Sequence, residues 1–216
     1  MIQVWIVGAG GFGREVLTWL DDATLVGVDE AWTVAGFLDA NPNALAPFGV
    51  DLPIVSSPKD YTPQPQDRFV CGIGSVRAKL AVCRDLQERG AQFVTLIHRS
   101  ALVGKRVTMG LGCVICPRVV LTADIQLSQW VVFNVASGAG HDVVVGEGTT
   151  ISGVCDLTGG AQLGEGVFLG SHAIVMPKVK VGDYATLGAG SVAFRDVPPY
   201  TTVMGVPAKT IFRAKD

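Results

Sequence analysis

Residues 163–192 read LGEGVFLGSHAIVMPKVKVGDYATLGAGSV, and an apolar residue stands at every sixth position of this stretch. The same spacing continues without a gap from Ile97 to Ala193, which makes 17 successive hexads. Hexads of this kind are typical of a parallel β-helix, in which each hexad forms one short strand and one corner. Since three hexads make one triangular coil, the sequence predicts a prism of between five and six coils, roughly 27 Å tall at the usual spacing of neighbouring strands.

Two positions of each hexad are expected to point into the prism. The first position carries the apolar residue, and the fifth carries a small or β-branched one, such as Cys113, Ser137 or Ala173. Glycine often occupies the second position, as at Gly104 and Gly146. Because a positive φ is cheap only for glycine, we expect this second position to turn the corner of the prism.

Residues 1–95 follow a different pattern, in which β-rich runs alternate with helical ones. The expected strands cover residues 2–7, 33–39, 68–74 and 92–97, and the expected helices cover about residues 12–20 and 75–90. The proline-rich residues 41–67 are expected to be mostly loop. Strands that alternate with helices indicate a small parallel α/β sheet. We therefore expect an α/β domain in residues 1–95, followed by a β-helix with a C-terminal cap in residues 96–216.

The charge balance gives no electrostatic reason to expect nucleic acid or an anionic membrane as a partner. Lys and Arg number 17 and Asp and Glu number 19, so the formal net charge is −2. No run of about 18 apolar residues is present, so no membrane span is expected. The apolar N-terminal residues lack the basic segment of a signal peptide. Together with an odd number of cysteines, 5, this indicates reduced thiols and a cytoplasmic location.

A glycine-rich segment lies between the first expected strand and the first expected helix. Residues 8–13 fit the GxGxxG pattern, and Asp39 ends the second strand. Taken alone, this combination suggests NAD, with Asp39 binding the ribose. Too little chain precedes the β-helix, however, for both halves of a dinucleotide fold. A half-Rossmann-like domain of this size can hold one nucleotide, with a phosphate near the helix N-terminus. Alternatively, the glycines serve only tight packing of the strand on the helix.

Nearly the full chain resembles the hexapeptide-repeat sugar O-acyltransferase family, which includes sialic acid O-acetyltransferases and bacillosamine-pathway nucleotide-sugar N-acetyltransferases. The matching segments occur in the family's order and cover residues 4–16 (VWIVGAGGFGREV), 36–42 (GFLDANP), 70–80, 95–104, 133–146, 163–192 and 205–209 (GVPAK). The resemblance implies a left-handed β-helix, acetyl-CoA as co-substrate, and a homotrimer in which neighbouring prisms share each cofactor groove. It also implies that the α/β domain binds the nucleotide-linked sugar acceptor.

His141 lies in the segment where the resembling family has its catalytic histidine. At the third position of its hexad, its side chain is expected to point outward. The resemblance implies that His141 takes the proton from an incoming amine or hydroxyl, which suits the imidazole group. It implies that Asp142 orients the ring and favours the imidazolium as it forms, and that no covalent acyl-enzyme arises. Without the resemblance, His141 and Asp142 would be interpreted as exposed corner residues.

Further contacts are implied by the family's motifs. Asp39 would contact the base or the ribose of the acceptor, and Asn134 would lie near the acceptor group. The residues implied near the nucleotide or its phosphates are Gly10, Gly74, Ser75 and Arg77. The residues implied at acetyl-CoA are Thr150, Gly159, Ser171, Ala189, Pro207 and Lys209. Thr150 stands where the family often has a second histidine, so its side-chain contact with the cofactor is an open question.

Neither a metal site nor a nucleophilic cysteine is expected. A catalytic zinc site on such a prism needs about three histidine ligands. His141 and His172 are 31 residues apart, which is not a whole number of coils, so they cannot stack on one edge. Cys113 and Cys116 form a CxxC pair, but Cys113 occupies an inward position and no second pair exists. We interpret both thiols as part of the core.

The sequence therefore predicts an enzyme that moves an acetyl group from acetyl-CoA to the amino group of a nucleotide-linked amino sugar used in surface-glycan synthesis. One alternative keeps the chemistry but acetylates a sugar hydroxyl, as in sialic acid. Another is a nucleotide-binding scaffold whose prism only trimerises, against which the His141–Asp142 pair argues. Asp39-Ala40 and Ser75-Val76 depart from the family's Asp-Asp and Asn-Asn, so the identity of the base stays open.

Overall fold

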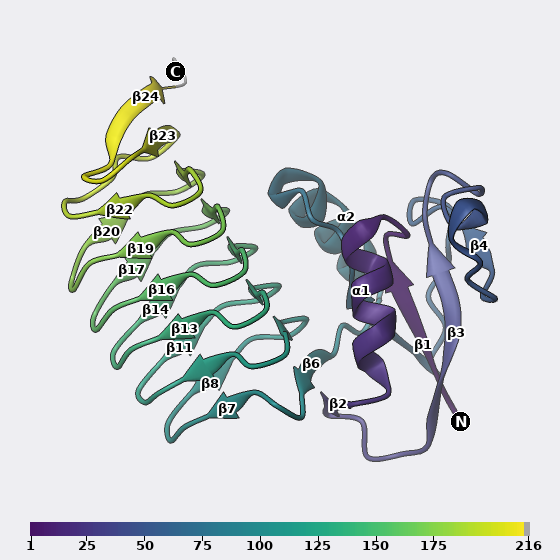
Figure 1. Cartoon of the computed structure of the whole chain (residues 1–216). Coiled ribbons are helices and arrows are strands. Elements are labelled where there is room, and N and C mark those ends of the chain that lie inside the picture. The colour runs from purple at the N-terminus through teal and green to yellow at the C-terminus, as the bar shows by residue number, and fades with distance from the viewer. Residues whose placement is uncertain (214–216) are drawn as a thin grey trace.

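The computed structural model describes residues 1–213, which form an α/β domain followed by a β-solenoid (Figure 1). The strands of the α/β domain are β1 (Ile2–Val7), β3 (Trp32–Leu38), β4 (Ile54–Ser56) and β5 (Asp67–Cys71). They form a parallel sheet in the order β4-β3-β1-β5. Its helices are α1 (Gly11–Leu20), α2 (Val76–Glu88) and a short 3-10 helix (Ala46–Phe48). Strands and helices therefore alternate as the sequence predicted.

One of the four strands in this sheet differs from the prediction. It is β4, which comes from the segment expected to be loop, whereas the strand predicted at residues 92–97 is not part of the sheet. Phe93 makes a single bridge to Phe69, and the chain then enters the solenoid as β6 (Thr95–His98). In addition, β2 (Ala23–Val26) pairs antiparallel with β6. A segment of the α/β domain thus extends a sheet of the solenoid and joins the two parts.

The solenoid has three faces, each built from parallel strands, and its C-terminal end carries a hairpin. Face 1 contains β6, β9 (Val114–Ile115), β12 (Val132–Phe133), β15 (Thr150–Ile151), β18 (Phe168–Leu169), β21 (Thr186–Leu187) and β23 (Thr201–Met204). Face 2 contains β7 (Leu102–Val103), β10 (Val120–Leu121), β13 (Gly138–Ala139), β16 (Asp156–Leu157), β19 (Ile174–Val175) and β22 (Val192–Ala193). Face 3 contains β8 (Thr108–Met109), β11 (Gln126–Leu127), β14 (Val144–Val145), β17 (Gln162–Leu163) and β20 (Lys180–Val181). Strand β24 (Lys209–Arg213) pairs antiparallel with β23.

The interior of the solenoid is built from the first and fifth hexad positions, as predicted. Every first-position residue from Ile115 to Ala193 is buried, and so are fifth-position residues such as Cys113 and Ala173. The first-position residues of the first coil are exceptions, because no further coil covers them: Val103 is 40% exposed, and Ile97 and Met109 are only partly buried. Burial of apolar side chains along the whole axis stabilises the stack of coils.

The corners of the prism differ from the expectation. Positive φ angles occur at the fourth hexad position, on residues such as Arg118 (61°), Asp142 (60°) and Tyr184 (54°), so their assignment to the second position is wrong. The second-position glycines are required for a different reason, which is steric. A Cβ on Gly104 would stand 1.6 Å from the carbonyl oxygen of Thr122 in the next coil. Glycine is therefore required there because successive coils approach closely.

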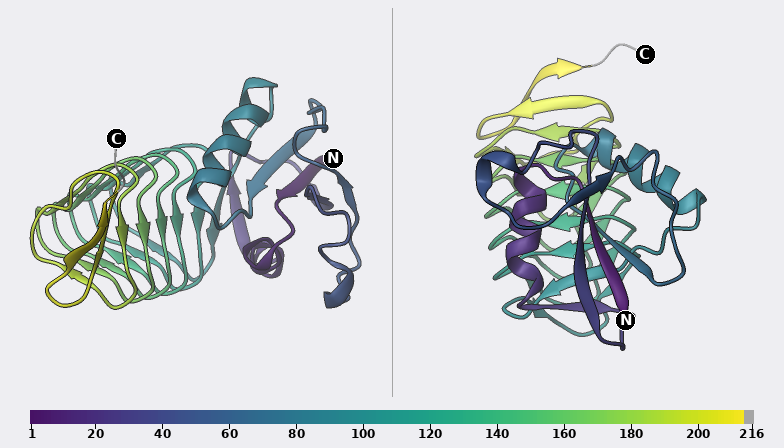
Figure 2. Two further views of the ribbon diagram at one scale, coloured as in Figure 1. Left: turned by 90° about the horizontal axis from the view of Figure 1, so that it is seen from above. Right: turned by 90° about the vertical axis from the view of Figure 1, so that its right-hand side faces the viewer.

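The α/β domain packs against one side of the solenoid, with α2 alongside it (Figure 2). Gly148 makes room for Leu80 of α2, since a Cβ on Gly148 would stand 2.4 Å from Leu80 Cδ2. Trp130 of the solenoid packs edge-on against Phe93, with ring centroids 5.7 Å apart. The two parts therefore share buried contacts. Within residues 1–213, neither α-helix has the length and apolar character needed to cross a membrane.

Candidate active site

His141 and Asp142 form a pair at the edge between faces 2 and 3, directly after β13. The Nδ1 atom of His141 lies 2.7 Å from Oδ2 of Asp142, and the two side chains are 71% and 68% exposed. Because an ionised carboxylate only accepts hydrogen bonds, Nδ1 carries the proton and donates it to Asp142. The other ring nitrogen, Nε2, is left with a free lone pair. This arrangement gives the ring the tautomer that a general base needs.

A second carboxylate, that of Asp124, lies one coil before this pair along the chain. Asp124 accepts a hydrogen bond from Arg106, with Nη2 and Oδ2 2.8 Å apart. The hydrogen bond from Arg106 and the charge of its guanidinium hold the pKa of Asp124 below its usual range. Asp124 therefore stays ionised near the imidazole, where a negative charge favours the imidazolium. Sequence reasoning missed Asp124, because its only signal is that it precedes Asp142 by one coil.

Gly159 lies against the ring of His141. A Cβ at this position would stand 2.6 Å from Nε2 and 2.7 Å from Cε1. Gly159 was predicted at acetyl-CoA, and the structure brings it to the atom that would act as base. Its lack of a side chain is what allows the imidazole to lie where it does.

A cavity of about 280 Å³ lies between the start of α1 and face 1; we call it the interface cavity. The α/β domain contributes Gly11, Phe12, Glu15, Ile73 and Gly74, and the solenoid contributes Val132, Asn134, Thr150, Ser152 and Phe168. The predicted site residues Gly74, Asn134 and Thr150 are thus brought together, although the sequence separates them. Sequence reasoning missed Glu15 and Ser152, which carry no motif of their own.

A cavity of about 430 Å³ surrounds Asp39; we call it the Asp39 cavity. Ile73 lines both this cavity and the interface cavity, so the two adjoin. The carboxylate of Asp39 accepts hydrogen bonds from the backbone N–H groups of Ala9 (2.7 Å) and Asn41 (2.8 Å). Asp39 therefore both lines the cavity and holds the glycine-rich turn in place.

The other residues predicted near the nucleotide have different surroundings. Gly10 is the N-cap of α1, and a Cβ there would meet no atom within 4 Å, so space for an anion exists at the helix N-terminus. Ser75 caps α2 and accepts a hydrogen bond from the N–H of Ala78 at 3.5 Å. Arg77 lines neither cavity named above. Its guanidinium carbon lies 5.6 Å from the ring centroid of Tyr184, in a separate cavity of about 370 Å³.

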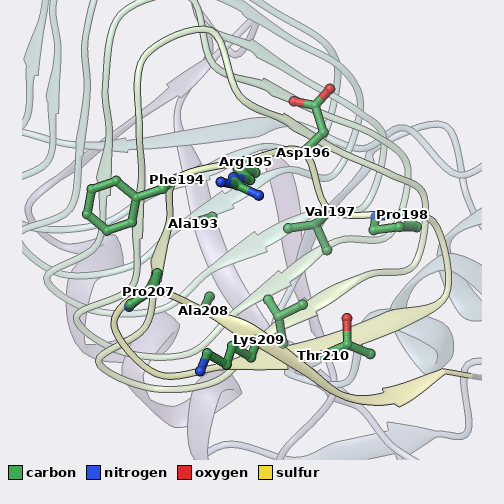
Figure 3. A pocket seen from close by; sticks show the side chains of 11 residues that line it. Ala193, Phe194, Arg195, Asp196, Val197, Pro198, Pro207, Ala208, Lys209 and Thr210 are labelled. Atoms are coloured by element: carbon green, nitrogen blue, oxygen red, sulfur yellow. The ribbon is translucent and has the colours of Figure 1, made fainter.

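Pro207 and Lys209 line a cavity of about 490 Å³ at the C-terminal end of the solenoid (Figure 3). The same cavity carries Phe194, Arg195 and Asp196 after β22. The two predicted residues thus share one site with a cation and an aromatic ring. This composition suits the nucleotide end of a cofactor.

The predicted cofactor residues lie on two different edges of the prism. His141 and Gly159 lie at the edge that follows face 2, since they come directly after β13 and β16. Ser171 and Ala189 lie at the edge that follows face 1, after β18 and β21, and Asn134 begins the same edge after β12. A single chain therefore does not bring His141 together with the interface cavity.

The thiols offer no nucleophile. All 5 cysteines are buried. Burial raises the pKa of Cys113 to about 11 and also raises that of Cys116, which disfavours the reactive thiolate. Among residues 1–213, no group of three His, Cys, Asp or Glu side chains is arranged to hold a metal ion.

Two family models match the chain. Residues 3–86 match the PglD N-terminal domain, and residues 160–193 match the bacterial transferase hexapeptide (six repeats). Among curated proteins, a serine acetyltransferase from Mycobacterium tuberculosis is 32% identical over 131 residues, which cover 58% of this chain and 55% of that protein. The matches cover between 27% and 55% of the length of the first curated relatives.

Solved structures match over nearly the full length. PerB from Caulobacter crescentus, in complex with CoA and GDP-perosamine, is 30% identical with a TM-score of 0.86, and the match covers 97% of each chain. Two variants of that enzyme with one histidine replaced were solved with the same ligands. The acetyltransferase domain of PglB from Neisseria gonorrhoeae, in complex with acetyl coenzyme A, is 26% identical with a TM-score of 0.84. That match covers 97% of this chain and 98% of the other.

Proposed function

The chain belongs to the hexapeptide-repeat acyltransferase family, in the group with a PglD N-terminal domain, and we propose that it acetylates the amino group of a nucleotide-linked amino sugar with acetyl-CoA. The observation that carries this proposal is the exposed pair of His141 and Asp142, in which the 2.7 Å contact at Nδ1 leaves Nε2 free to accept a proton. An exposed base at the edge of the prism suits a reaction between two bound substrates.

The reaction is a direct attack. The amine nitrogen of the sugar attacks the carbonyl carbon of the thioester, and Nε2 of His141 takes the proton that the nitrogen loses. The C–S bond then breaks, and the sulfur of CoA leaves as a thiolate, which receives the proton from the imidazolium. Asp142 and the ionised Asp124 stabilise the positive ring between these two proton transfers. The burial of all 5 cysteines agrees with a route that has no covalent acyl-enzyme.

The acceptor would occupy the two adjoining cavities. We place the nucleotide in the Asp39 cavity and the amino sugar in the interface cavity, with a phosphate near the N-terminus of α1. PerB, which covers the same length of chain, was solved with CoA and a nucleotide amino sugar, which supports an acceptor of this class.

The complete site would form between copies of the chain in a homotrimer. His141 lies at one edge of the prism, and Asn134, Ser171 and Ala189 lie at another. If His141 of one copy meets the interface cavity of the next, base and acceptor come together. Acetyl-CoA would then lie in the groove between the two prisms, in contact with both edges.

The test is the release of free CoA thiol from acetyl-CoA in the presence of a panel of acceptors. The panel contains GDP-, UDP- and dTDP-linked 4-amino sugars, the same nucleotides linked to the corresponding 4-hydroxy sugars, and free sialic acid. We expect thiol release, and an acetamide product by mass spectrometry, with at least one amino sugar. Turnover with only the hydroxy sugars or sialic acid would replace this proposal by O-acetylation. Thiol release with no acceptor at all would identify hydrolysis instead of transfer.

A further inference from the structure

Lys79 of α2 has no exposed surface and, among residues 1–213, no carboxylate partner. Its exposed fraction is 0%. Its ammonium donates a hydrogen bond to the hydroxyl of Thr150, with Nζ and Oγ1 2.8 Å apart, and contacts the carbonyl oxygen of Thr149 at 3.5 Å. A buried ammonium with so few partners costs stability. A role in stabilising the domain contact therefore does not account for a charge at this place.

The contact fixes the direction of the Thr150 hydroxyl. An ammonium group only donates, so Oγ1 of Thr150 accepts from Lys79 and its own proton points elsewhere. Among residues 1–213, the Thr150 hydroxyl donates no hydrogen bond. Thr150 also lines the interface cavity, next to Asn134 and Ser152. The hydroxyl proton is therefore available to an acceptor bound in the cavity that Thr150 lines.

We propose that Lys79 is a positioning residue, which holds the hydroxyl of Thr150 as a hydrogen-bond donor toward the carbonyl oxygen of the acetyl group. This inference rests on the proposed function. When the amine attacks the thioester, the carbonyl oxygen gains negative charge, and a fixed donor stabilises it. No proton leaves Thr150 or Lys79 in this step. The hydrogen bond from the charged ammonium of Lys79 polarises the hydroxyl of Thr150 and makes it a stronger donor. When the C–S bond breaks, the oxygen becomes a neutral carbonyl again.

The proposal predicts a dependence on pH with a definite sign. Burial lowers the pKa of Lys79 to about 8, while the thiols of Cys71, Cys83 and Cys113, from β5, α2 and the segment before β9, act in the opposite direction. Above that pH the neutral amine of Lys79 can accept a hydrogen bond. The hydroxyl of Thr150 then turns its proton toward Lys79 and away from the cavity. The kcat should therefore fall as the pH rises through about 8.

The experiment measures kcat and both KM values from pH 6 to pH 10 for the wild type, Lys79→Met, Thr150→Val, Thr150→Ser and the double variant Lys79→Met/Thr150→Val. Thr150→Val should lower kcat at pH 7 by about 100-fold, the loss expected for one such donor. Lys79→Met should lower it by about 10-fold and abolish the alkaline fall. Thr150→Ser should keep most of the activity, and the double variant should be no worse than Thr150→Val alone.

Two controls distinguish a positioning role of Lys79 from a purely structural one. Thermal melting of Lys79→Met should give a Tm equal to or above that of the wild type, because the variant removes a buried charge. Cys71→Ser should keep the alkaline fall, since the hydrogen bond from Cys83 lowers the pKa of Cys71 and makes this thiol the other candidate for such a titration. If Lys79→Met does not fold, the pair Thr150→Val and Thr150→Ser decides the question.

Wild-type kcat and an unchanged alkaline fall in Lys79→Met would overturn the inference, as would wild-type kcat in Thr150→Val or loss of the fall in Cys71→Ser. In each of these cases the wild type still acetylates an amino sugar, and the proposed function stands. A wild type that acetylates no member of the acceptor panel overturns the proposed function, and this inference with it.

Discussion

The imidazole of His141 lies against Gly159, the residue one coil further along the chain, so closely that a methyl group on Gly159 would stand 2.6 Å from Nε2. This contact joins two neighbouring coils at the edge after face 2. It means that the position of the ring depends on a residue that has no side chain. The contact also defines which variants should move the base without removing it.

Gly159→Ala should lower kcat by about 10-fold to 100-fold while the protein stays folded. The added methyl group forces the ring of His141 to rotate away, and a displacement of this size misaligns a proton transfer. Steady-state kinetics and a thermal melt measure the two quantities. The matched control is Gly138→Ala on β13, where a Cβ would meet its nearest atom at 3.7 Å. Equal kcat values for the two variants would show that the position of the ring is not critical.

His141→Ala should lower kcat by roughly 10²–10⁴, the usual contribution of a general base. The Tm should change little, because the side chain is 71% exposed. Asp142→Asn should have a smaller effect of about 10-fold, since an amide oxygen can still accept the hydrogen bond from Nδ1 but no longer carries the charge. Near-wild-type turnover in folded His141→Ala would contradict the proposed mechanism.

Much of the solenoid could be predicted from the sequence because its contacts repeat with the hexad. Each inward position from Ile115 onward meets the same surroundings, so one rule applied to every coil. The corners were assigned wrongly because glycine at the second position is conspicuous, whereas the fourth position mixes glycine with many other residue types. Arg118, Asp142 and Tyr184 all take a positive φ there. Stacking between coils, which a local pattern does not contain, is what requires glycine at second positions such as Gly104.

The site was predictable only where a motif marks it. His141 and Asp142 are adjacent in the sequence, and their 2.7 Å contact follows from that. Lys79 could not be found, because its partner Thr150 is 71 residues away and nothing near Lys79 in the sequence distinguishes it from an exposed helix residue. The interface cavity likewise arises from the docking of the α/β domain on face 1, which no motif encodes.

Glu165→Gln should lower the free energy of unfolding at neutral pH by about 1 kcal/mol or less, since its ion pair with Arg84 is partly exposed. A hydrogen bond from Tyr184, together with Arg84, holds the pKa of Glu165 below its usual range. A carboxyl with a lowered pKa stabilises the fold above its unfolded pKa, near 4.3, and this stabilisation is lost as the pH falls further. The difference between wild type and variant should therefore vanish at low pH.

Urea unfolding at pH 7 and at pH 3.5 measures this difference. The matched control is Glu88→Gln, an exposed glutamate on the same helix as Arg84, which should leave the free energy of unfolding nearly unchanged at both pH values. A difference for Glu165→Gln that persists undiminished at the lower pH would mean that its cause is packing and not charge.

Light scattering should report a mass near 68 kDa, which corresponds to three chains of 22.6 kDa. If His141 of one copy acts on a substrate in the interface cavity of the next, two inactive variants should complement each other. His141→Ala lacks the base, and Gly74→Phe fills the interface cavity without backbone strain. Co-expressed mixed trimers should regain up to about one third of the wild-type activity, since one site of three is then intact. No recovery in mixed trimers would indicate that each chain holds a complete site.

Asp39→Ala should raise the KM for the nucleotide-linked sugar and leave the KM for acetyl-CoA nearly unchanged. Asp39 lines the Asp39 cavity and fixes the backbone of Ala9 and Asn41 through hydrogen bonds of 2.7 and 2.8 Å. Its loss therefore removes a polar contact to the nucleotide and loosens the turn that would hold a phosphate. One such contact is worth about 1–3 kcal/mol, which corresponds to roughly 5–150-fold in KM.

Calorimetry of the wild type and Asp39→Ala with UDP, GDP, CMP and NADH identifies the ligand of the Asp39 cavity. We expect at least one of the first three nucleotides to bind, with an affinity that falls in the variant, and NADH to bind weakly or not at all. Tight binding of NADH without any response to UDP, GDP or CMP would contradict an acceptor domain and favour a dinucleotide site. Weak binding of all four would favour a free sugar as the acceptor, because such a sugar needs nothing from Asp39.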